Sequence, residues 1–374
     1  MHIAINGMFW NEPLVGSGQY LHGLLAGLLR SAPQHRYTLL VPQGHTAVAA
    51  PIEVVEVATP FGERRGPAKL WFEQVGVVQA AQRVAADLLH VPYFAPPLHA
   101  SVPVVVTILD LIPLLLPEYR GRPAVRAYMR LVAAAAPRAD RILAISEAAR
   151  HDIMIHLGVA AERIITTPLA AGAHYRPVAD AGATVAARYG IEAPFIYYVG
   201  GLDARKNLAT LIAAFARLRQ AGGPPATLVI AGRARGSDPL LFPDVDALLA
   251  DAGVADGVRR IDVPYNDSAL LYSAATVFAF PSRYEGFGLP PLEAMACGTP
   301  CVVAEASSLP EVVGDAALRV PPHDTAGWVA ALWRLLGDAA LRDKLRRRGF
   351  GRAAQFSYDA TARTTLDVYA SAIS

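Results

Sequence analysis

The chain has 374 residues, of which 53% are hydrophobic and 18% are charged, and its formal net charge is +2. This length exceeds what one ordinary hydrophobic core accommodates, so we expect about two domains. The near-neutral balance argues against a nucleic-acid-binding protein, because such proteins gather basic residues on one face. Cys297 and Cys301 do not suggest a disulfide framework, which favours a reduced, cytoplasmic compartment.

The chain opens on a short apolar strand, Met1 to Asn6, that leads into a glycine-containing loop. A secretory signal would have a basic segment followed by an apolar core, so we predict none here. Nor does any apolar stretch approach the roughly 18 residues that a membrane-spanning helix needs. Any contact with a membrane is therefore expected to be peripheral.

Gly16-Ser17-Gly18 ends this loop and precedes a predicted helix, 19–30. A helix N-terminus behind a glycine turn can bind phosphate. The dinucleotide fingerprint G-x-G-x-x-G is incomplete, because Leu21 replaces its third glycine and no acidic residue follows at the expected distance of about 20 residues. Gly16 and Gly18 therefore either face a diphosphate or simply form a tight turn.

Short apolar strands alternate with helices through the rest of the first half, which predicts a parallel sheet. Asp110 follows one of these strands and is either a polar residue of a cleft or a turn residue that bonds nearby backbone amides. Ser146 is predicted to cap the helix that follows it. The predicted strands are 37–41, 52–57, 88–91, 102–108 and 142–145, and the predicted helices are 68–86, 123–136 and 148–157.

The helix 123–136 has a basic face, because Arg122, Arg126 and Arg130 recur at four-residue spacing. Charge at helical spacing is typical of a solvated face. The other interpretation is attraction to an anionic membrane or to a lipid-phosphate acceptor.

The composition changes at 170–182 to Ala, Gly, Pro and Asp, which indicates an interdomain linker. Strands and helices then alternate again. The loop 200–207, after a predicted strand 195–199, carries Arg205 and Lys206 just before a helix. Two cations and free backbone amides at that point can hold a diphosphate, whereas a plain turn with exposed basic residues is the other possibility.

The stretch FPSRYEGFGLPPLEAMACGTP, 280–300, has the most specific pattern in the chain. It follows an apolar run that predicts a buried strand, and it carries Glu285 in a Gly/Pro loop. Glu293 is predicted in the first turn of the helix that begins after two prolines. Each glutamate alone could be a solvated acid or a partner of the helix dipole. Together they lie where ligands bind, in the crevice at the carboxyl edge of an open α/β sheet.

Helices are also predicted at 208–218 and 268–275 and at 326–336, 339–348 and 359–372, and strands at 226–231, 258–263 and 301–304. Ser307 and Ser308 precede a short helical segment. Their hydroxyls can cap it, and its amides offer a second phosphate site.

The spacing of Glu285 and Glu293 resembles the E-x7-E signature of retaining nucleotide-sugar glycosyltransferases of the GT-B type, glycosyltransferase family 4 (group 1). The resemblance implies an α/β fold with two Rossmann-like parallel-sheet domains facing a central cleft. It implies an acceptor-side domain at 1–172, a nucleotide-sugar-binding domain at 183–355 and a terminal helix at 356–374 that crosses back to the first domain.

The same resemblance implies hexose transfer, possibly of mannose, with retention of configuration. The donor would be a GDP- or UDP-linked sugar and the acceptor a glycan or a lipid-linked molecule of cell-surface polysaccharide biosynthesis. No metal ligand set or cofactor is expected. A nucleotide-sugar epimerase, a glycan phosphorylase and a non-catalytic nucleotide-sugar-binding relative stay as alternatives.

By this resemblance Glu285 contacts the donor sugar, Glu293 the ribose hydroxyls and Lys206 the donor phosphates. Gly201 stands where the family often has an arginine, so Arg205 is expected to supply that charge. Leu109 replaces the histidine that usually precedes Asp110. The catalytic candidates are thus Glu285, Lys206, Arg205 and Asp110, and the donor-binding candidates are Glu293, Gly16, Gly18, Gly201, Gly286, Phe287, Gly288 and Leu289.

Overall fold

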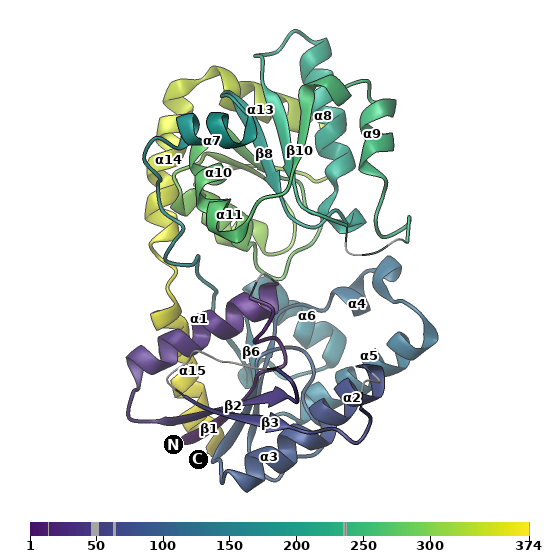
Figure 1. Cartoon of the computed structure of the whole chain (residues 1–374), viewed down its shortest axis with the longest axis vertical. Coiled ribbons are helices and arrows are strands. Elements are labelled where there is room, and N and C mark those ends of the chain that lie inside the picture. Colours follow the sequence, from purple (N-terminus) through teal and green to yellow (C-terminus); the bar gives the residue numbers. More distant parts are fainter. Residues whose placement is uncertain (14, 46–51, 63–64, 235, 237, 374) are drawn as a thin grey trace. The chain divides into compact units, whose positions relative to one another are not determined.

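The computed structural model describes residues 1–13, 15–45, 52–62, 65–234, 236 and 238–373. It divides into two compact units, each containing one sheet (Figure 1). Unit 1 consists of Met1–Leu169 and Ser357–Ser374, and unit 2 of Ala170–Phe356. The segment 170–182, predicted as a linker, belongs to unit 2 and runs into a helix, α7 (Ala181–Tyr189).

Unit 1 is built on a seven-stranded parallel sheet of order β3-β2-β1-β4-β5-β6-β7. Its strands are β1 (His2–Asn6), β2 (Arg36–Pro42), β3 (Glu53–Val57), β4 (Leu88–Val91), β5 (Val104–Ile108), β6 (Arg141–Ala144) and β7 (Ile164–Thr166). Its helices are α1 (Gly16–Ser31), α2 (Arg65–Trp71), α3 (Val77–Arg83), α4 (Ile112–Leu115), α5 (Pro123–Ala135), α6 (Glu147–Leu157) and α15 (Tyr358–Ile373).

Helices cover both faces of this sheet, which explains why its strands are almost continuously apolar. Alternate residues of β5 face opposite ways. Val106 and Ile108 belong to a core cluster with Phe72 and Val77 from the helices after β3. Thr107 faces the other side, where its hydroxyl contacts Tyr20 of α1.

Two buried hydrogen bonds join the C-terminal helix α15 to the face of the sheet on which Thr107 lies. His90 Nδ1 lies 2.6 Å from the Tyr369 hydroxyl of α15, and His90 Nε2 lies 2.8 Å from Thr107 Oγ1. Burial lowers the pKa of His90 to about 3, so the ring is neutral and can accept one hydrogen bond while donating the other. The C-terminal helix α15, which is 16 residues long, is therefore part of the unit 1 core although it follows the whole of unit 2 in sequence.

Unit 2 is built on a six-stranded parallel sheet of order β10-β9-β8-β11-β12-β13. Its strands are β8 (Phe195–Val199), β9 (Thr227–Ala231), β10 (Val258–Ile261), β11 (Val277–Phe280), β12 (Cys301–Ala304) and β13 (Ala317–Val320). Besides α7, its helices are α8 (Leu208–Gln220), α9 (Val245–Asp251), α10 (Ser268–Ala274), α11 (Leu289–Ala296), α12 (Leu309–Val313), α13 (Thr325–Gly337) and α14 (Ala339–Ala353).

The two parallel-sheet α/β domains confirm the predicted fold class. Ser146 caps α6 as predicted, because its hydroxyl accepts a hydrogen bond from the backbone N–H of Ala149 at 2.9 Å. The predicted helix 68–86 is interrupted by a π-helical turn, Phe72–Gly76, between α2 and α3. β7, β13, α4, α7 and α9 were not predicted from the sequence, since elements this short show too little periodicity.

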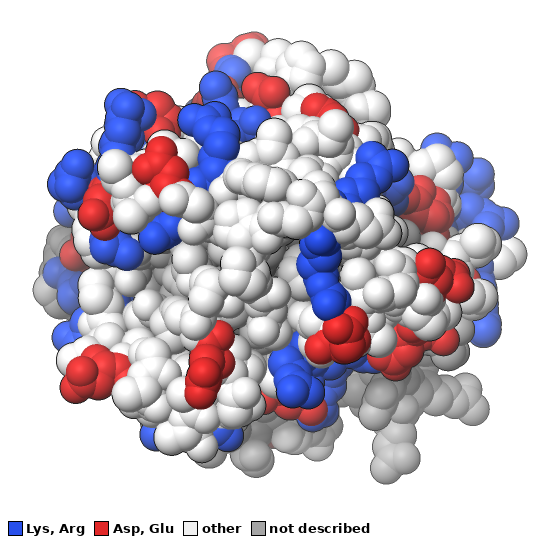
Figure 2. Space-filling view, turned by 90° about the horizontal axis from the view of Figure 1, so that it is seen from above, with Lys and Arg blue, Asp and Glu red and all other residues white. Residues whose placement is uncertain are grey.

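Charges are mixed on the surface. Figure 2 shows Lys and Arg side chains interspersed with Asp and Glu around a broad uncharged area. Within the described part of the chain, no helix is both long and apolar enough to cross a bilayer.

The contact between α1 and α15 yields a prediction for stability. A Cβ atom on Gly27 would lie 2.4 Å from the Tyr358 carbonyl oxygen, whereas one on Gly16, in the same helix, would meet no atom within 4 Å. Gly27→Ala must therefore push the helices apart, and we expect it to be less stable than Gly16→Ala by about 1–3 kcal/mol. Chemical denaturation of both variants measures this difference. Equal stability of the two variants would contradict the close packing of α1 on α15.

Candidate functional site

In the sheet of unit 2, the order in which the chain adds strands reverses between β8 and β11. From β8 the chain proceeds to β9 and β10 on one side, whereas β11 leads to β12 and β13 on the other. The loops that leave the carboxyl ends of β8 and β11 therefore diverge, and ligands bind at such a switch point in open α/β sheets. The loop after β8 carries Arg205 and Lys206, and the loop after β11 carries Glu285.

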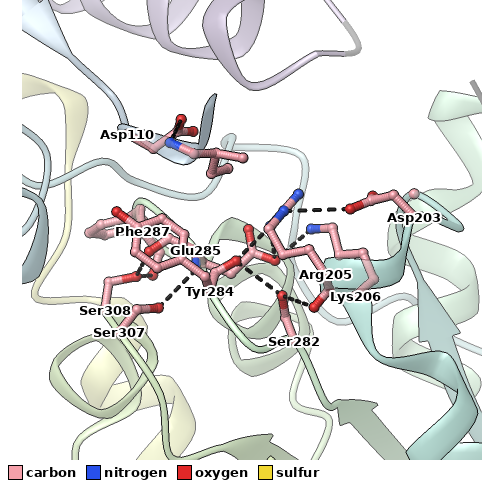
Figure 3. Close-up of polar contacts among 12 residues, drawn as sticks. Asp110, Asp203, Arg205, Lys206, Ser282, Tyr284, Glu285, Phe287, Ser307 and Ser308 are labelled. Carbon is pink, nitrogen blue, oxygen red and sulfur yellow. Dashed lines mark hydrogen bonds and ion pairs between the residues drawn. The ribbon is translucent and has the colours of Figure 1, made fainter. Parts of the chain in front are cut away.

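These two loops are joined by a buried ion cluster (Figure 3). Glu285 Oε1 lies 2.6 Å from Lys206 Nζ and 2.9 Å from an Arg205 guanidinium nitrogen. Arg205 also lies 3.5 Å from Asp203. The Lys206 ammonium is 5.0 Å from the centre of the Phe280 ring. The structure thus brings together three of the predicted catalytic residues and adds Asp203, which the sequence analysis did not single out.

The cluster is electrically balanced. Asp203, Arg205, Lys206 and Glu285 contribute two positive and two negative charges, and the side chains of Lys206 and Glu285 are only 11% and 12% exposed. Burial alone would raise the pKa of Glu285, but the charges of Lys206 and Arg205 outweigh it and hold the pKa at about 2. Glu285 is therefore ionised at neutral pH. Burial lowers the pKa of Lys206, and the nearby carboxylate of Glu285 opposes this shift.

Serine hydroxyls hold the Glu285 loop in place. Ser307 Oγ accepts a hydrogen bond from the Glu285 backbone N–H at 2.8 Å, and Ser308 Oγ contacts the carbonyl oxygens of Glu285 and Phe287 at 2.8 and 2.5 Å (Figure 3). Neither hydroxyl caps α12, so that prediction is wrong. The serines instead satisfy backbone groups of a loop that has no strand or helix partner.

The loop after β8 is held by Asn207. Its backbone is left-handed, with φ of 57°, and its side-chain amide donates to the carbonyl oxygens of Pro281 and Pro322 at 3.1 and 2.7 Å. Ser282 Oγ contacts the Tyr284 carbonyl oxygen at 3.2 Å. The sequence analysis missed these roles, because no spacing pattern marks a side chain that bonds to distant backbone.

Backbone geometry requires glycine at two positions near the cluster. Gly232, at the end of β9, has φ of 137°, and a Cβ there would lie 1.9 Å from the Gly200 carbonyl oxygen. Gly288 has φ of 124°, a conformation that other residues rarely adopt. Gly201 is different: a Cβ there would lie 2.6 Å from Asp203 Oδ2.

The remaining donor-binding candidates of unit 2 surround the Glu285 loop. Gly286 is buried, Leu289 is half-buried and begins α11, and the Phe287 ring packs edge-on against Phe356, with 5.7 Å between ring centres. The Phe287 side chain is thus buried against Phe356.

Glu293 lies in the second turn of α11, which corrects the predicted position in the first turn. The helix begins at Leu289, so that Pro290 and Pro291 occupy its first turn and Glu293 is its fifth residue. Glu293 is 6% exposed, and its carboxyl group accepts a hydrogen bond from the Tyr272 hydroxyl at 2.9 Å. Burial raises its pKa to about 7, and hydrogen bonds from Tyr272 and Tyr175 only partly offset this effect.

The unit 1 candidates have the following positions. Asp110 is half-buried, and its Oδ1 accepts a hydrogen bond from the Ile112 N–H at 3.1 Å, which is the turn geometry considered as its alternative role. Gly16 is exposed. Gly18 is buried where a Cβ would lie 2.0 Å from the Glu12 carbonyl oxygen, so this glycine permits close packing of the preceding loop. Arg122, Arg126 and Arg130 are exposed at the start of α5 and along it.

The described side chains include no group of three or more His, Cys, Asp or Glu residues that could hold a metal ion. Both cysteines are buried free thiols.

Comparisons with known proteins agree on one family. Residues 188–352 match the family model described as glycosyl transferases group 1, and residues 15–170 match that of glycosyltransferase family 4. The chain is 34% identical to the O-antigen chain mannosyltransferase B of Escherichia coli over 75% of its own length and 74% of that protein.

Solved structures show the same fold. Sucrose-phosphate synthase from Thermosynechococcus elongatus superposes with a TM-score of 0.77 at 23% identity, over 99% of this chain and 98% of that one. The Anabaena protein Alr3699/HepE, solved in complex with UDP, gives a TM-score of 0.75 at 18% identity, over 99% and 100%. Both domains of this chain therefore have the GT-B topology.

The raised pKa of Glu293 predicts how stability depends on pH. The folded state binds the proton more tightly than the unfolded state, whose carboxyl has the ordinary pKa of 4.5. Stability should therefore be highest below pH 4.5 for this group and fall as the pH rises to about 7, by on the order of 3 kcal/mol. Glu293→Gln should flatten this decline, which denaturation at pH 5 and pH 7.5 measures.

Exposed Glu192 offers the matched control, because Glu192→Gln should leave the decline unchanged. Glu285 does not affect this measurement. Because its pKa is lowered, its contribution to the free energy of unfolding is complete above pH 4.5 and is lost only as the pH falls toward 2. An equally steep decline in Glu293→Gln would show that Glu293 does not titrate as described.

Proposed function

The chain belongs to glycosyltransferase family 4, the group 1 glycosyltransferases, and we propose that it transfers mannose from a nucleoside-diphosphate sugar to a glycan acceptor with retention of configuration. The similarity to an O-antigen mannosyltransferase supports the choice of sugar and a role in cell-surface polysaccharide synthesis. The donor nucleotide is proposed to be guanosine or uridine diphosphate.

The ion cluster at the switch point of unit 2 is the observation that carries this proposal. Breaking a sugar–phosphate bond develops negative charge on the nucleoside diphosphate and positive charge on the sugar. Cations that are already in place stabilise the leaving group without reorganising during the reaction. Lys206 and Arg205 meet this requirement, because each is oriented by contacts to a carboxylate. No resident cofactor is proposed.

Donor binding would rearrange the hydrogen bonds of the cluster. The diphosphate oxygens would take over contacts that Lys206 Nζ and Arg205 now make with Glu285. Glu285 would then be an ionised acceptor for hydroxyl groups of the donor sugar. In this exchange the two cations stay paired with the phosphates and Glu285 stays hydrogen-bonded to hydroxyls, which matters because leaving a buried charge without a partner costs about 3–5 kcal/mol.

Glu293 is proposed to bind the ribose hydroxyls of the donor. The hydroxyls of Tyr272 and Tyr175 now donate hydrogen bonds to its carboxyl group. A ribose would have to replace one of these phenols, and loss of a proton from a group with a pKa of about 7 would strengthen its new hydrogen bonds. Asp110, Gly16 and Gly18 are proposed to belong to the donor side of the site only by resemblance to the family.

A peripheral membrane contact of unit 1 is also proposed. The first residues of α5 are exposed, including Arg122, Arg126 and Val125, whose exposed fraction is 44%. Arg130 lies one turn further along the same helix and is exposed too. Exposed cations beside an apolar side chain suit an anionic bilayer, where each adds about 1 kcal/mol of attraction. This contact would bring the enzyme to a lipid-linked acceptor.

The proposed activity predicts that incubation with GDP-mannose or UDP-mannose and a mannose-containing acceptor releases the nucleoside diphosphate and forms a product with the donor's anomeric configuration. NMR of the product determines that configuration.

Lys206→Ala should weaken nucleoside diphosphate binding, because a charged hydrogen bond contributes about 1.5–3 kcal/mol. Isothermal titration measures the loss.

Two glutamate variants serve as further controls in the same titration. Glu293→Ala should weaken binding of the bare nucleotide, whereas Glu285→Ala should mainly impair turnover. Unchanged affinity in Lys206→Ala would remove this lysine from the phosphate site. Binding without sugar transfer would support the non-catalytic alternative, and conversion of the free nucleotide sugar would support an epimerase.

The membrane proposal predicts that the protein sediments with phosphatidylglycerol vesicles and not with phosphatidylcholine vesicles. Reversing the charge of Arg122, Arg126 and Arg130 together should abolish this binding. Reversing Arg217, Lys344 and Arg347, three exposed cations of unit 2, is the matched control and should leave it intact. Equal loss in both triple variants would indicate a general effect of net charge instead.

A further inference from the structure

The sheet of unit 1 has the same kind of switch point as that of unit 2. From β1 the chain proceeds to β2 and β3, whereas β4 leads to β5, β6 and β7 on the other side. The loops after β1 and β4 therefore diverge, and the carboxyl ends of these strands form a position where ligands bind. In unit 2 the equivalent position holds the ion cluster. The position in unit 1 is therefore a candidate binding site for the second substrate.

The loop after β1 begins with two hydrogen-bonded turns. Its turns are closed by backbone hydrogen bonds from Trp10 N–H to the Gly7 carbonyl oxygen at 2.9 Å and from Glu12 N–H to the Phe9 carbonyl oxygen at 3.0 Å. The Phe9 ring packs edge-on against Tyr93, which follows β4, at 4.9 Å between ring centres. The two loops of the switch point therefore support each other.

Trp10 lies in this loop on an aromatic support. The His22 ring stacks on the indole, with 3.9 Å between ring centres and an angle of 27° between the planes. His22 Nε2 lies 2.8 Å from the Trp10 carbonyl oxygen and must be the donor, because a carbonyl oxygen can only accept. Trp10 stays half-buried, and the next three residues, Asn11, Glu12 and Pro13, are exposed.

A buried polar network fixes the base of the loop. Asn6, the last residue of β1, accepts a hydrogen bond from the Met8 N–H at 3.0 Å and donates to the Tyr93 hydroxyl at 3.1 Å. Tyr93 donates to Glu73, in the π-helical turn, at 3.1 Å. Tyr128 of α5 donates to the other oxygen of Glu73 at 2.8 Å. This fully buried carboxylate would be costly if it were unpaired, but besides the two phenols Lys69 Nζ lies 3.7 Å from its Oε1, so the network under the loop is closed.

We propose that Trp10, backed by His22, is the stacking platform for a sugar ring of the acceptor. A hexose has an apolar face of C–H groups and a rim of hydroxyls. The apolar face gains dispersion and hydrophobic contact on an indole. Asn11 and Glu12 offer side-chain acceptors and donors for the hydroxyls beside it. This inference rests on the proposed function for its ligand class, and it locates the acceptor on residues that the E-x7-E resemblance does not mention.

The test measures binding of mannotriose by saturation-transfer NMR and by tryptophan fluorescence. The wild-type protein should bind, Trp10→Ala should bind about tenfold more weakly, and Trp10→Phe should recover most of the affinity because it keeps an aromatic face. Trp333→Ala, which removes a 39% exposed tryptophan of unit 2, is the matched control and should bind like the wild type.

Titration of the same variants with GDP and UDP separates this inference from the proposed function. Trp10→Ala should bind nucleoside diphosphate as the wild type does, since Trp10 is not among the residues proposed to contact the donor. If the wild type bound neither GDP nor UDP, the proposed function would be refuted. Intact nucleotide binding together with equal mannotriose affinity in Trp10→Ala, or with no mannotriose binding at all, would overturn the platform.

Discussion

The pairing of Glu285 with Lys206 and Arg205 is the constraint on which the organisation of unit 2 depends. One carboxylate oxygen lies within 2.6 and 2.9 Å of two cations, and the three side chains come from loops on opposite sides of a switch point. Removing such charges from water is costly, and their attraction compensates only when the geometry is good. The loops must therefore be held accurately, and Ser307, Ser308 and Asn207 hold them through backbone hydrogen bonds.

The same residue type behaves in opposite ways at the two glutamates of the signature. Glu285 has two cations beside it, and its pKa is lowered to about 2. Glu293 has phenol groups beside it, and its pKa is raised to about 7. Both are buried, so the neighbouring charges decide the outcome. One carboxylate is thereby a permanent anion, and the other can gain or lose a proton near neutral pH.

The two units show how one topology positions different chemistry. In both sheets the order of strands reverses between two central strands, and the loops after these strands carry the polar and aromatic groups that we assign to substrates. Unit 2 places charges there, which suits a diphosphate. Unit 1 places an indole there above a buried network, which suits the uncharged face of a sugar. Loop composition, and not the sheet, distinguishes the two sites.

The sequence by itself determined the class of fold and the family. Strands that are apolar on both faces and alternate with helices leave few alternatives to parallel sheets, and the spacing of Glu285 and Glu293 indicated the family that the comparisons show. Local patterns also located the cap at Ser146, because a cap depends on residues three positions apart.

Only the tertiary structure decided how these groups meet. The start of α11 at Leu289 places Glu293 among aromatic side chains. The hydroxyls of Ser307 and Ser308 contact the backbone of a loop 21 to 23 residues earlier in the chain and do not cap α12. The partners of His90 and Glu73 come from distant segments, with Tyr369 as the extreme case. Hydrogen bonds and ion pairs between such residues depend on distances in space, and no periodicity along the chain encodes them.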